Sequence, residues 1–212
     1  TKFSQYEIDG LLVSQPENRR YLSGFHGSAG YLIISSTKAI LATDFRYTEQ
    51  ARNQAAEFEV IQIGGQAGSW LADILSGMGI NLLGFESEDM TFAAYRTLTE
   101  AVKDLNVKFV PVKGLAESLR QVKEPEELEL IVKAAAITDS AYKHIDEIIR
   151  PGMTEIGLAW EIEKFLRGSG SETLPFEAIV ASGPNAALPH ANPGERKINK
   201  GEPIVIDIGA KC

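Results

Sequence analysis

Short stretches with the patterns of β-strands and α-helices alternate along the first 110 residues of the chain. This alternation constrains the fold most, because strands interleaved with helices form a sheet that the helices cover. Strand-like runs occur at 10–13, 31–34, 39–42, 58–63, 80–85 and 107–110. Helical patterns lie at 47–56, 69–76 and 91–103, the last with Thr91 as a candidate N-cap. We predict an α/β domain with a mostly parallel or mixed sheet flanked by helices.

The pattern changes near residue 120, where residues 123–127 (KEPEE) have the composition of a helix start. Pro125 loses nothing at the first helical position, and the acids beside it oppose the helix dipole. An apolar stripe at helical spacing follows, made of Leu128, Ile131, Val132, Ala135, Tyr142, Ile145 and Ile149. A second helix is expected from 154 or 155 to Gly168. We therefore predict two domains, 1–121 and 122–212.

Charge and hydropathy exclude several classes of partner. The chain has 21 Lys and Arg against 29 Asp and Glu, a net charge of −8, and no basic stripe, so nucleic acid is not expected to bind. Its apolar runs, such as 31–34, fall far short of the roughly 20 residues that cross a bilayer. The single cysteine, Cys212, allows no disulfide within the chain, which fits a cytoplasmic location.

The chain ends inside an apolar run at 203–212. A complete domain rarely stops one step after a buried-looking strand, so we expect a fragment of a longer protein. Such a cut predicts exposed apolar surface and an unpaired strand edge in the second domain. A partner chain, a swapped dimer or a missing segment would have to cover them.

Asp207 is the first candidate for chemistry. Strand alternation over 204–208 places Ile204, Ile206 and Ile208 on one face, and Val205 and Asp207 on the other. A carboxylate buried there would need a metal ion, an Arg or several backbone N–H groups to offset its burial. The strand alone also allows a simpler interpretation, in which Asp207 points to water at the strand end.

His190 is the second candidate, and it lies in an irregular loop rich in Gly, Pro and Asn that covers 183–203. Loops of this length usually serve a function. An imidazole has a pKa near neutrality, so it can shuttle a proton or donate to a developing oxyanion. Read alone, the residue is better interpreted as an ordinary histidine on a surface loop.

Other polar residues give weaker signals. His26 lies among Gly24, Gly27 and Gly30, whose spacing is typical of a tight turn and differs from the dinucleotide fingerprint. His144 faces away from the apolar stripe of its helix and is expected to be solvated. Ser28 and Ser182 show no local partner that would make a nucleophile.

Taken together, several segments resemble the pita-bread metallopeptidases, which include prolidase (Xaa-Pro dipeptidase), aminopeptidase P and relatives of creatinase. The segments 18–25 (NRRYLSGF), 27–30 (GSAG) and 43–47 (TDFRY) are similar to the creatinase/prolidase N-terminal domain. The later segments are similar to the start of the catalytic domain, and they are 119–127 (LRQVKEPEE), 150–155 (RPGMTE), 176–187, 189–191 (PHA), 201–202 (GE) and 206–210 (IDIGA). Their order and spacing make the resemblance specific.

The resemblance implies a fold and a reaction. The fold is an α/β N-terminal domain followed by an incomplete α+β pita-bread domain, and the reaction is hydrolysis of Xaa-Pro peptide bonds with two divalent ions, Mn, Co or Zn. It assigns Asp207 as the first of five metal ligands. It assigns His190 to substrate contact and to stabilisation of the tetrahedral intermediate, and Phe176 to substrate binding. It also implies a homodimer and a proline-containing peptide substrate.

The sequence departs from the family where the other ligands should be. The second Asp is expected about ten residues after Asp207, yet five residues follow it. One ligand of five remains, whereas a carboxylate and imidazole site needs roughly four to six donors. We therefore expect this 212-residue chain to bind no metal tightly and to be inactive alone.

Two alternatives from other classes stay open. A metal-free relative that hydrolyses creatine would keep the fold and His190, although Asp207 argues against it. A non-catalytic module of the same fold would bind peptides or support dimerisation through residues 1–120.

Overall fold

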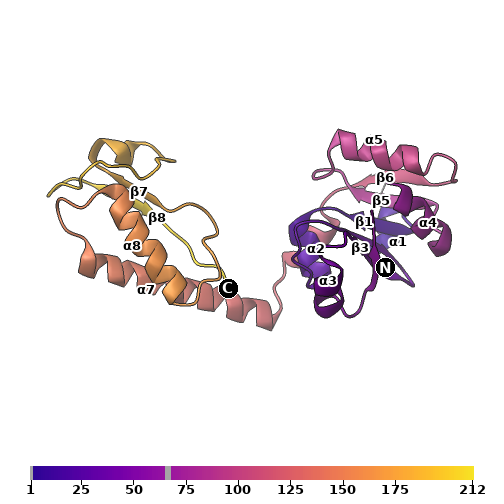
Figure 1. Cartoon of the computed structure of the whole chain (residues 1–212), viewed down its shortest axis with the longest axis horizontal. Helices are drawn as coiled ribbons and strands as arrows, with labels where there is room; N and C mark the ends of the chain where they lie inside the picture. Colours follow the sequence, from indigo (N-terminus) through magenta and orange to yellow (C-terminus); the bar gives the residue numbers. More distant parts are fainter. Residues whose placement is uncertain (1, 65–67) are drawn as a thin grey trace. The chain divides into compact units, whose positions relative to one another are not determined.

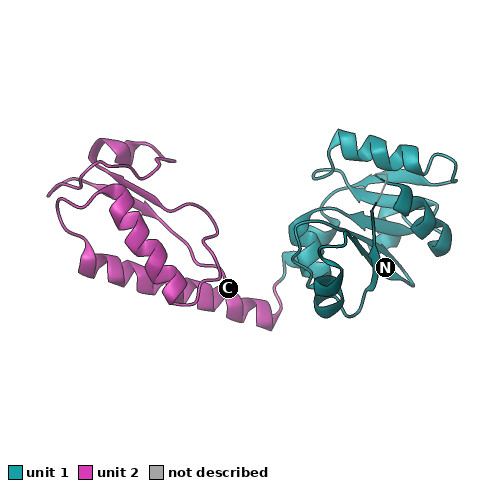
Figure 2. Cartoon of the chain, viewed as in Figure 1, with its two compact units in different colours: residues 1–122 teal, residues 123–212 magenta. Residues whose placement is uncertain are grey.

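The computed structural model describes residues 2–64 and 68–212. The chain divides into two compact units, unit 1 from Thr1 to Val122 and unit 2 from Lys123 to Cys212 (Figure 2). Each unit has a hydrophobic core of its own, as expected of separate domains.

Unit 1 is built on a six-stranded mixed sheet with the strand order β4-β3-β2-β1-β5-β6. The strands are β1 (Gly10–Val13), β2 (Tyr31–Ser35), β3 (Ala39–Thr43), β4 (Glu59–Gln62), β5 (Leu82–Glu86) and β6 (Lys108–Val112). The pairs β1–β2 and β2–β3 are antiparallel, and β3–β4, β1–β5 and β5–β6 are parallel. The mixed sheet predicted from the sequence is confirmed.

Helices cover both faces of this sheet (Figure 1). They are α1 (Lys2–Tyr6), α2 (Pro16–Ser23), α3 (Thr48–Gln54), α4 (Ser69–Met78), α5 (Phe92–Ala101) and α6 (Leu115–Arg120). Along β1, Leu12 packs in one core with Leu71 of α4, while Leu11 packs in the other with Ala51 of α3 and Leu115 of α6. This split follows from the two-residue period of a strand. The Thr91 hydroxyl accepts from the Ala94 N–H at 3.2 Å, which confirms the predicted cap of α5.

Unit 2 packs two helices against a two-stranded sheet (Figure 1). Its elements are α7 (Pro125–Ile148), α8 (Glu155–Gly168), β7 (Ile179–Ser182), the 3₁₀ helix η1 (Gly183–Ala187) and β8 (Ile204–Asp207). β7 and β8 are antiparallel, with Ile179 opposite Asp207. Pro125 lies at the start of α7 as predicted, and the Thr154 hydroxyl caps α8 by accepting from the Gly157 N–H.

The apolar stripe predicted along α7 is wrong in part. The buried side chains of this helix are Ile137, Ala141 and Ile145, whereas Leu128, Ile131, Val132 and Tyr142 are exposed. For the first half of the helix the reason is length, because α7 has 24 residues and spans about 36 Å, but α8 has 14 and spans about 21 Å. The core of unit 2 includes α7 residues only from Ile137 onward. The periodicity of the sequence correctly predicted a helix, but it could not predict which part of the helix packs against the rest of unit 2.

The segment 183–203, predicted as irregular throughout, has local order. It begins with η1, and Lys197 forms a β-bridge with Thr154 just before α8. Exposed apolar side chains expected in the second domain are present, with Val205 at 41% exposure and the first half of α7 as the main examples. In the part of the chain that the structure describes, no helix is both long and apolar enough to cross a membrane.

Candidate functional site

Strand β8 presents Asp207 to the solvent. Ile208 is buried on the core side, while Val205 and Asp207 are exposed on the opposite side, so the predicted alternation is correct. The Tyr142 hydroxyl of α7 donates to the Ile206 carbonyl at 3.0 Å and braces the strand beside Asp207. Burial and the charge of Asp207 both raise the pKa of Tyr142. A carboxylate at this open position is available to a ligand.

Phe176 lies close to the end of the same strand. A Cβ atom placed on Gly209 would come within 3.2 Å of the Phe176 ring and 3.3 Å of Pro175, so Gly209 packs tightly against both side chains. The ring remains 45% exposed. The fold therefore brings Phe176 and the strand end that carries Asp207 together, although 30 residues separate them in sequence.

His190 is exposed on the segment that follows η1. Among the described residues, no hydrogen bond or ion pair joins its imidazole to Asp207 or to any other group. Nearby backbone bonds shape the chain around it, since the Leu188 N–H donates to the Asn185 carbonyl and the Ala191 N–H donates to the Leu188 carbonyl. The position of the imidazole thus depends on how its segment is anchored.

The anchor is Glu155, which the sequence did not indicate. Its carboxylate is fully buried at the start of α8. Oε1 accepts from the backbone N–H and hydroxyl of Ser182 at 2.7 and 2.8 Å, and the Asn185 amide donates to both oxygens at 3.1 Å. The Gly194 N–H donates to Oε2 at 3.3 Å. Burial opposes ionisation, but these hydrogen bonds outweigh it and hold the pKa of Glu155 below its ordinary value.

An ion pair closes the base of the same segment. Both terminal nitrogens of Arg196 donate to the Glu202 carboxylate at 2.7 and 2.6 Å, and Arg196 also donates to the Ser182 hydroxyl. This pairing lowers the pKa of Glu202 to about 2. Gly183 has φ of +50°, and a Cβ there would lie 2.5 Å from both Arg196 and Glu202. Ser182 is therefore a buried structural hydroxyl, as expected of a residue without a nucleophile's partners.

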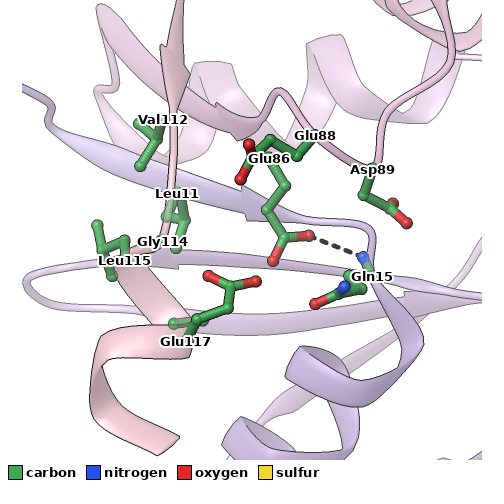
Figure 3. Close-up of a pocket in the computed structure, with 10 residues that line it drawn as sticks. Leu11, Gln15, Glu86, Glu88, Asp89, Val112, Gly114, Leu115 and Glu117 are labelled. Carbon is green, nitrogen blue, oxygen red and sulfur yellow. Dashed lines mark hydrogen bonds between the residues drawn. The ribbon is translucent and has the colours of Figure 1, made fainter. Parts of the chain in front are cut away.

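Unit 1 has a polar cavity of about 230 Å³ at the carboxyl ends of β1, β5 and β6 (Figure 3). Its lining includes Glu86, Glu88, Asp89 and Glu117, and the Glu86 and Glu117 carboxylates point toward each other. Burial raises the pKa of Glu86, and the charge of Glu117 acts in the same direction against three donated hydrogen bonds.

The partners of Glu86 show that it fastens helices to the sheet. The backbone N–H groups of Ser14 and Gln15, which directly precede α2, donate to Oε2 at 2.6 and 2.7 Å. The Asn18 amide donates to Oε1 of Glu86 and to Oε1 of Glu117, each at 2.6 Å. The pocket therefore links β5, α2 and α6, and this accounts for its polar groups.

The weaker sequence candidates have structural roles. Gly27 leaves no space for a Cβ against the Phe25 ring, so its segment is a packed turn. The Ser28 hydroxyl bonds to the Tyr47 hydroxyl, and the His26 ring bonds to the Gln54 amide, both at 2.6 Å. The expectation that His144 is solvated is wrong, because its ring is partly buried and stacks on Phe165 of α8 with centroids 4.4 Å apart.

The donor set does not make a divalent-metal site. Across residues 2–64 and 68–212, no group of three or more His, Cys, Asp or Glu side chains is arranged to hold a metal ion. Asp207 is a single exposed carboxylate, and a hard divalent cation needs several oxygen or nitrogen donors. These residues therefore do not fit a complete metal centre.

The chain therefore combines an α/β domain with a second unit in which two helices pack against a two-stranded sheet. Residues 1–122 match the family described as the creatinase/prolidase N-terminal domain, and residues 129–212 match metallopeptidase family M24. The chain belongs to the proteins in which a creatinase/prolidase N-terminal domain precedes an M24 domain.

Similar proteins share nearly the whole chain. A Bacillus subtilis protein named uncharacterized peptidase YqhT is 41% identical over 208 residues, which are 98% of this chain and 58% of that protein. The Xaa-Pro dipeptidase of Pyrococcus horikoshii is 30% identical over 206 residues, covering 96% of this chain and 56% of that protein. The chain thus spans less than three fifths of these relatives.

Solved structures of peptidases are also similar to this chain. The Xaa-Pro dipeptidase from Bacillus anthracis superposes with a TM-score of 0.91 at 39% identity, over 98% of this chain and 58% of that one. The N-terminal domain of the cytoplasmic peptidase PepQ from Mycobacterium tuberculosis was solved as a separate chain. It matches with a TM-score of 0.52 at 39% identity, over 56% of this chain and 92% of that one.

Proposed function

We propose that this chain, within a protein of the length of its relatives, belongs to a metal-dependent hydrolase of Xaa-Pro peptide bonds, a dipeptidase or an aminopeptidase. The observation that carries the proposal is the end of β8, where Asp207 is an exposed carboxylate and Gly209, two residues later, packs against the half-exposed ring of Phe176. Relatives named Xaa-Pro dipeptidase support it.

Asp207 is proposed as a metal ligand. Its exposure on a strand braced by Tyr142 suits a carboxylate that must meet further donors at fixed geometry. The family implies two divalent ions, for which Mn, Co and Zn are the candidates. Since the donors described here do not form a complete site, we propose that the 212 residues alone bind no metal tightly and are inactive.

His190 and Phe176 are proposed to act on the substrate. The exposed imidazole of His190 can donate a hydrogen bond to the carbonyl oxygen of the scissile bond as negative charge develops on it. The exposed part of the Phe176 ring offers apolar surface to a proline ring. The substrate is accordingly a short proline-containing peptide.

The proposal extends to assembly and location. We propose a homodimer that acts in the cytoplasm, without nucleic acid or membrane partners. The net charge of −8 and the absence of a disulfide-forming cysteine pair support this setting. Light scattering on the 212-residue chain and on residues 1–122 would test the dimer. A monomeric mass for both proteins would contradict it.

The activity is tested with a protein of the relatives' full length, loaded with Mn²⁺ and assayed on Ala-Pro and Ala-Ala. We expect cleavage of Ala-Pro, and a loss of at least a hundredfold in H190A and D207N. E195Q, an exposed acid in the same segment, is the matched control and should retain activity.

The 212-residue chain assayed in parallel should show neither activity nor a stoichiometric metal ion. Absence of cleavage by the longer protein with any of the three metals would reject the proposed reaction and favour a non-catalytic module.

A further inference from the structure

The segment that carries His190 starts and ends on one buried carboxylate. We propose that Glu155 is a positioning residue, which holds segment 186–193 so that the His190 imidazole meets the substrate. This inference rests on the proposed function for the role of His190, but the anchoring itself is independent of it.

The anchors flank His190 on both sides. Asn185 lies five residues before it and Gly194 four residues after it, and both donate to the carboxylate of Glu155. One side chain thus ties the two ends of the intervening segment together. Ser182, at the end of β7, donates to the same group and connects the anchor to the sheet.

Backbone bonds align α8 with the far end of the segment. The Glu155 N–H donates to the Arg196 carbonyl and the Ile156 N–H donates to the Gly194 carbonyl, each at 3.0 Å. Glu155 is therefore fixed relative to the loop by its main chain as well as by its side chain. A carboxylate that is itself immobile can set the position of what binds to it.

A carboxylate suits this position better than a neutral side chain. The groups around Glu155 are donors from Ser182, Asn185 and Gly194, and an ionised carboxylate offers acceptors alone. Glutamine would keep the shape but turn an N–H₂ group toward at least one of these donors. Arg196 and Glu202 close the base of the segment, between Ser182 and Asn199, and would keep it folded when Glu155 is changed.

The first test measures amide hydrogen exchange in the 212-residue chain. In E155Q we expect the amides of Leu188, Ala191 and Gly194 to exchange at least tenfold faster, while Leu41 in the core of unit 1 is unchanged. E163Q changes an exposed acid on the same helix that pairs with Arg167, and it should leave those three amides as they are.

N185A removes two of the anchoring bonds at a less buried residue, and it should give a smaller increase in exchange. It decides the question if E155Q does not fold. Unchanged exchange of the three amides in a folded variant would overturn the proposal.

The second test is a double-mutant cycle in the longer protein with Mn²⁺ and Ala-Pro. Because Glu155 acts through His190, E155Q should lower kcat about tenfold with KM within twofold, and E155Q/H190A should be no slower than H190A. Losses that multiply would overturn the proposal, since they would show that Glu155 acts independently of His190. If H190A alone leaves kcat unchanged, the role proposed for His190 is wrong, and the exchange data still decide whether Glu155 holds the loop.

Discussion

Each unit buries a glutamate, and the two respond to burial in opposite ways. Glu86 of unit 1 is 9% exposed and its pKa is raised, whereas Glu155 of unit 2 is fully buried and its pKa is lowered. Both accept from backbone N–H groups and from an asparagine amide. Solvent exposure alone therefore does not explain the difference, because hydrogen bonds outweigh the effect of burial at Glu155 but not at Glu86.

The difference lies in the neighbouring charges and in the donors. Glu86 faces Glu117, a second carboxylate that shares the same Asn18 amide, and the charge of Glu117 disfavours ionisation of Glu86. Glu155 is surrounded by donors and lies near the positive charge of Arg196. Like charge adds to desolvation in unit 1, while hydrogen bonds overcome desolvation in unit 2.

The largest expected effect comes from removing the better satisfied carboxylate. Glu155→Ala leaves buried donors from Ser182 and Gly194 without an acceptor and should destabilise unit 2 by about 3 to 5 kcal/mol. Glu86→Ala should destabilise unit 1 by about 2 kcal/mol. Amide hydrogen exchange in urea measures the stability of each unit separately. Equal losses of stability in the two variants would contradict this ranking.

Acid should affect the stability of the two units differently. Glu155 and Glu202 have lowered pKa values, so their contribution to unit 2 is complete above about pH 4.5 and is lost as pH falls toward 2. Glu86 has a raised pKa, so its contribution to unit 1 is complete below its unfolded value and is lost as pH rises through the folded value.

We therefore expect unit 2 to unfold before unit 1 as the pH falls from 4.5 to 2. NMR methyl signals of Leu41 and Leu158 would report on units 1 and 2 respectively. Simultaneous loss of both signals would contradict this order.

Amide replacement should sharpen the contrast. Glu155→Gln is expected to cost about 2 kcal/mol at pH 7, because the introduced N–H₂ group meets other donors. Glu86→Gln removes a repulsion with Glu117 and should cost less than about 1 kcal/mol. The urea midpoints of unfolding of the two variants measure these losses of stability. A larger loss for Glu86→Gln would show that repulsion between Glu86 and Glu117 does not set the stability of the Glu86 site.

The smallest effects should be alike in the two units. Thr91→Ala and Thr154→Ala each remove one N-cap hydrogen bond, from α5 and α8 respectively, and each should cost about 1 kcal/mol. Each loss should appear only in the unit that carries the change. Amide hydrogen exchange of α5 and α8, measured as the temperature is raised, checks this. A loss of stability in the unit that does not carry the change would show that the two units are coupled.

Local rules accounted for much of the fold and for one part of the site. Thr91 and Pro125 marked helix starts because capping chemistry acts within one turn. The outward side of Asp207 followed from alternation within five residues. These features depend on near neighbours in sequence, so the sequence was sufficient to predict them.

Features that depend on distant partners were missed. Glu155 looked like an ordinary acid at a helix start, since its donors at Ser182 and Gly194 lie 27 and 39 residues further along the chain. The buried side of α7 was misplaced because the length of α8 decides which half of α7 is covered. The stacking of His144 on Phe165 likewise required the packing of two helices.

The position of β1 in its sheet has a consequence for synthesis on the ribosome. Its neighbour β2 ends at Ser35, but its other neighbour, β5, ends only at Glu86. At about 5 to 20 residues per second, translation of the intervening chain takes roughly 3 to 10 seconds. During that interval one edge of β1 lacks its partner, and nascent-chain binding factors have their best opportunity to cover it.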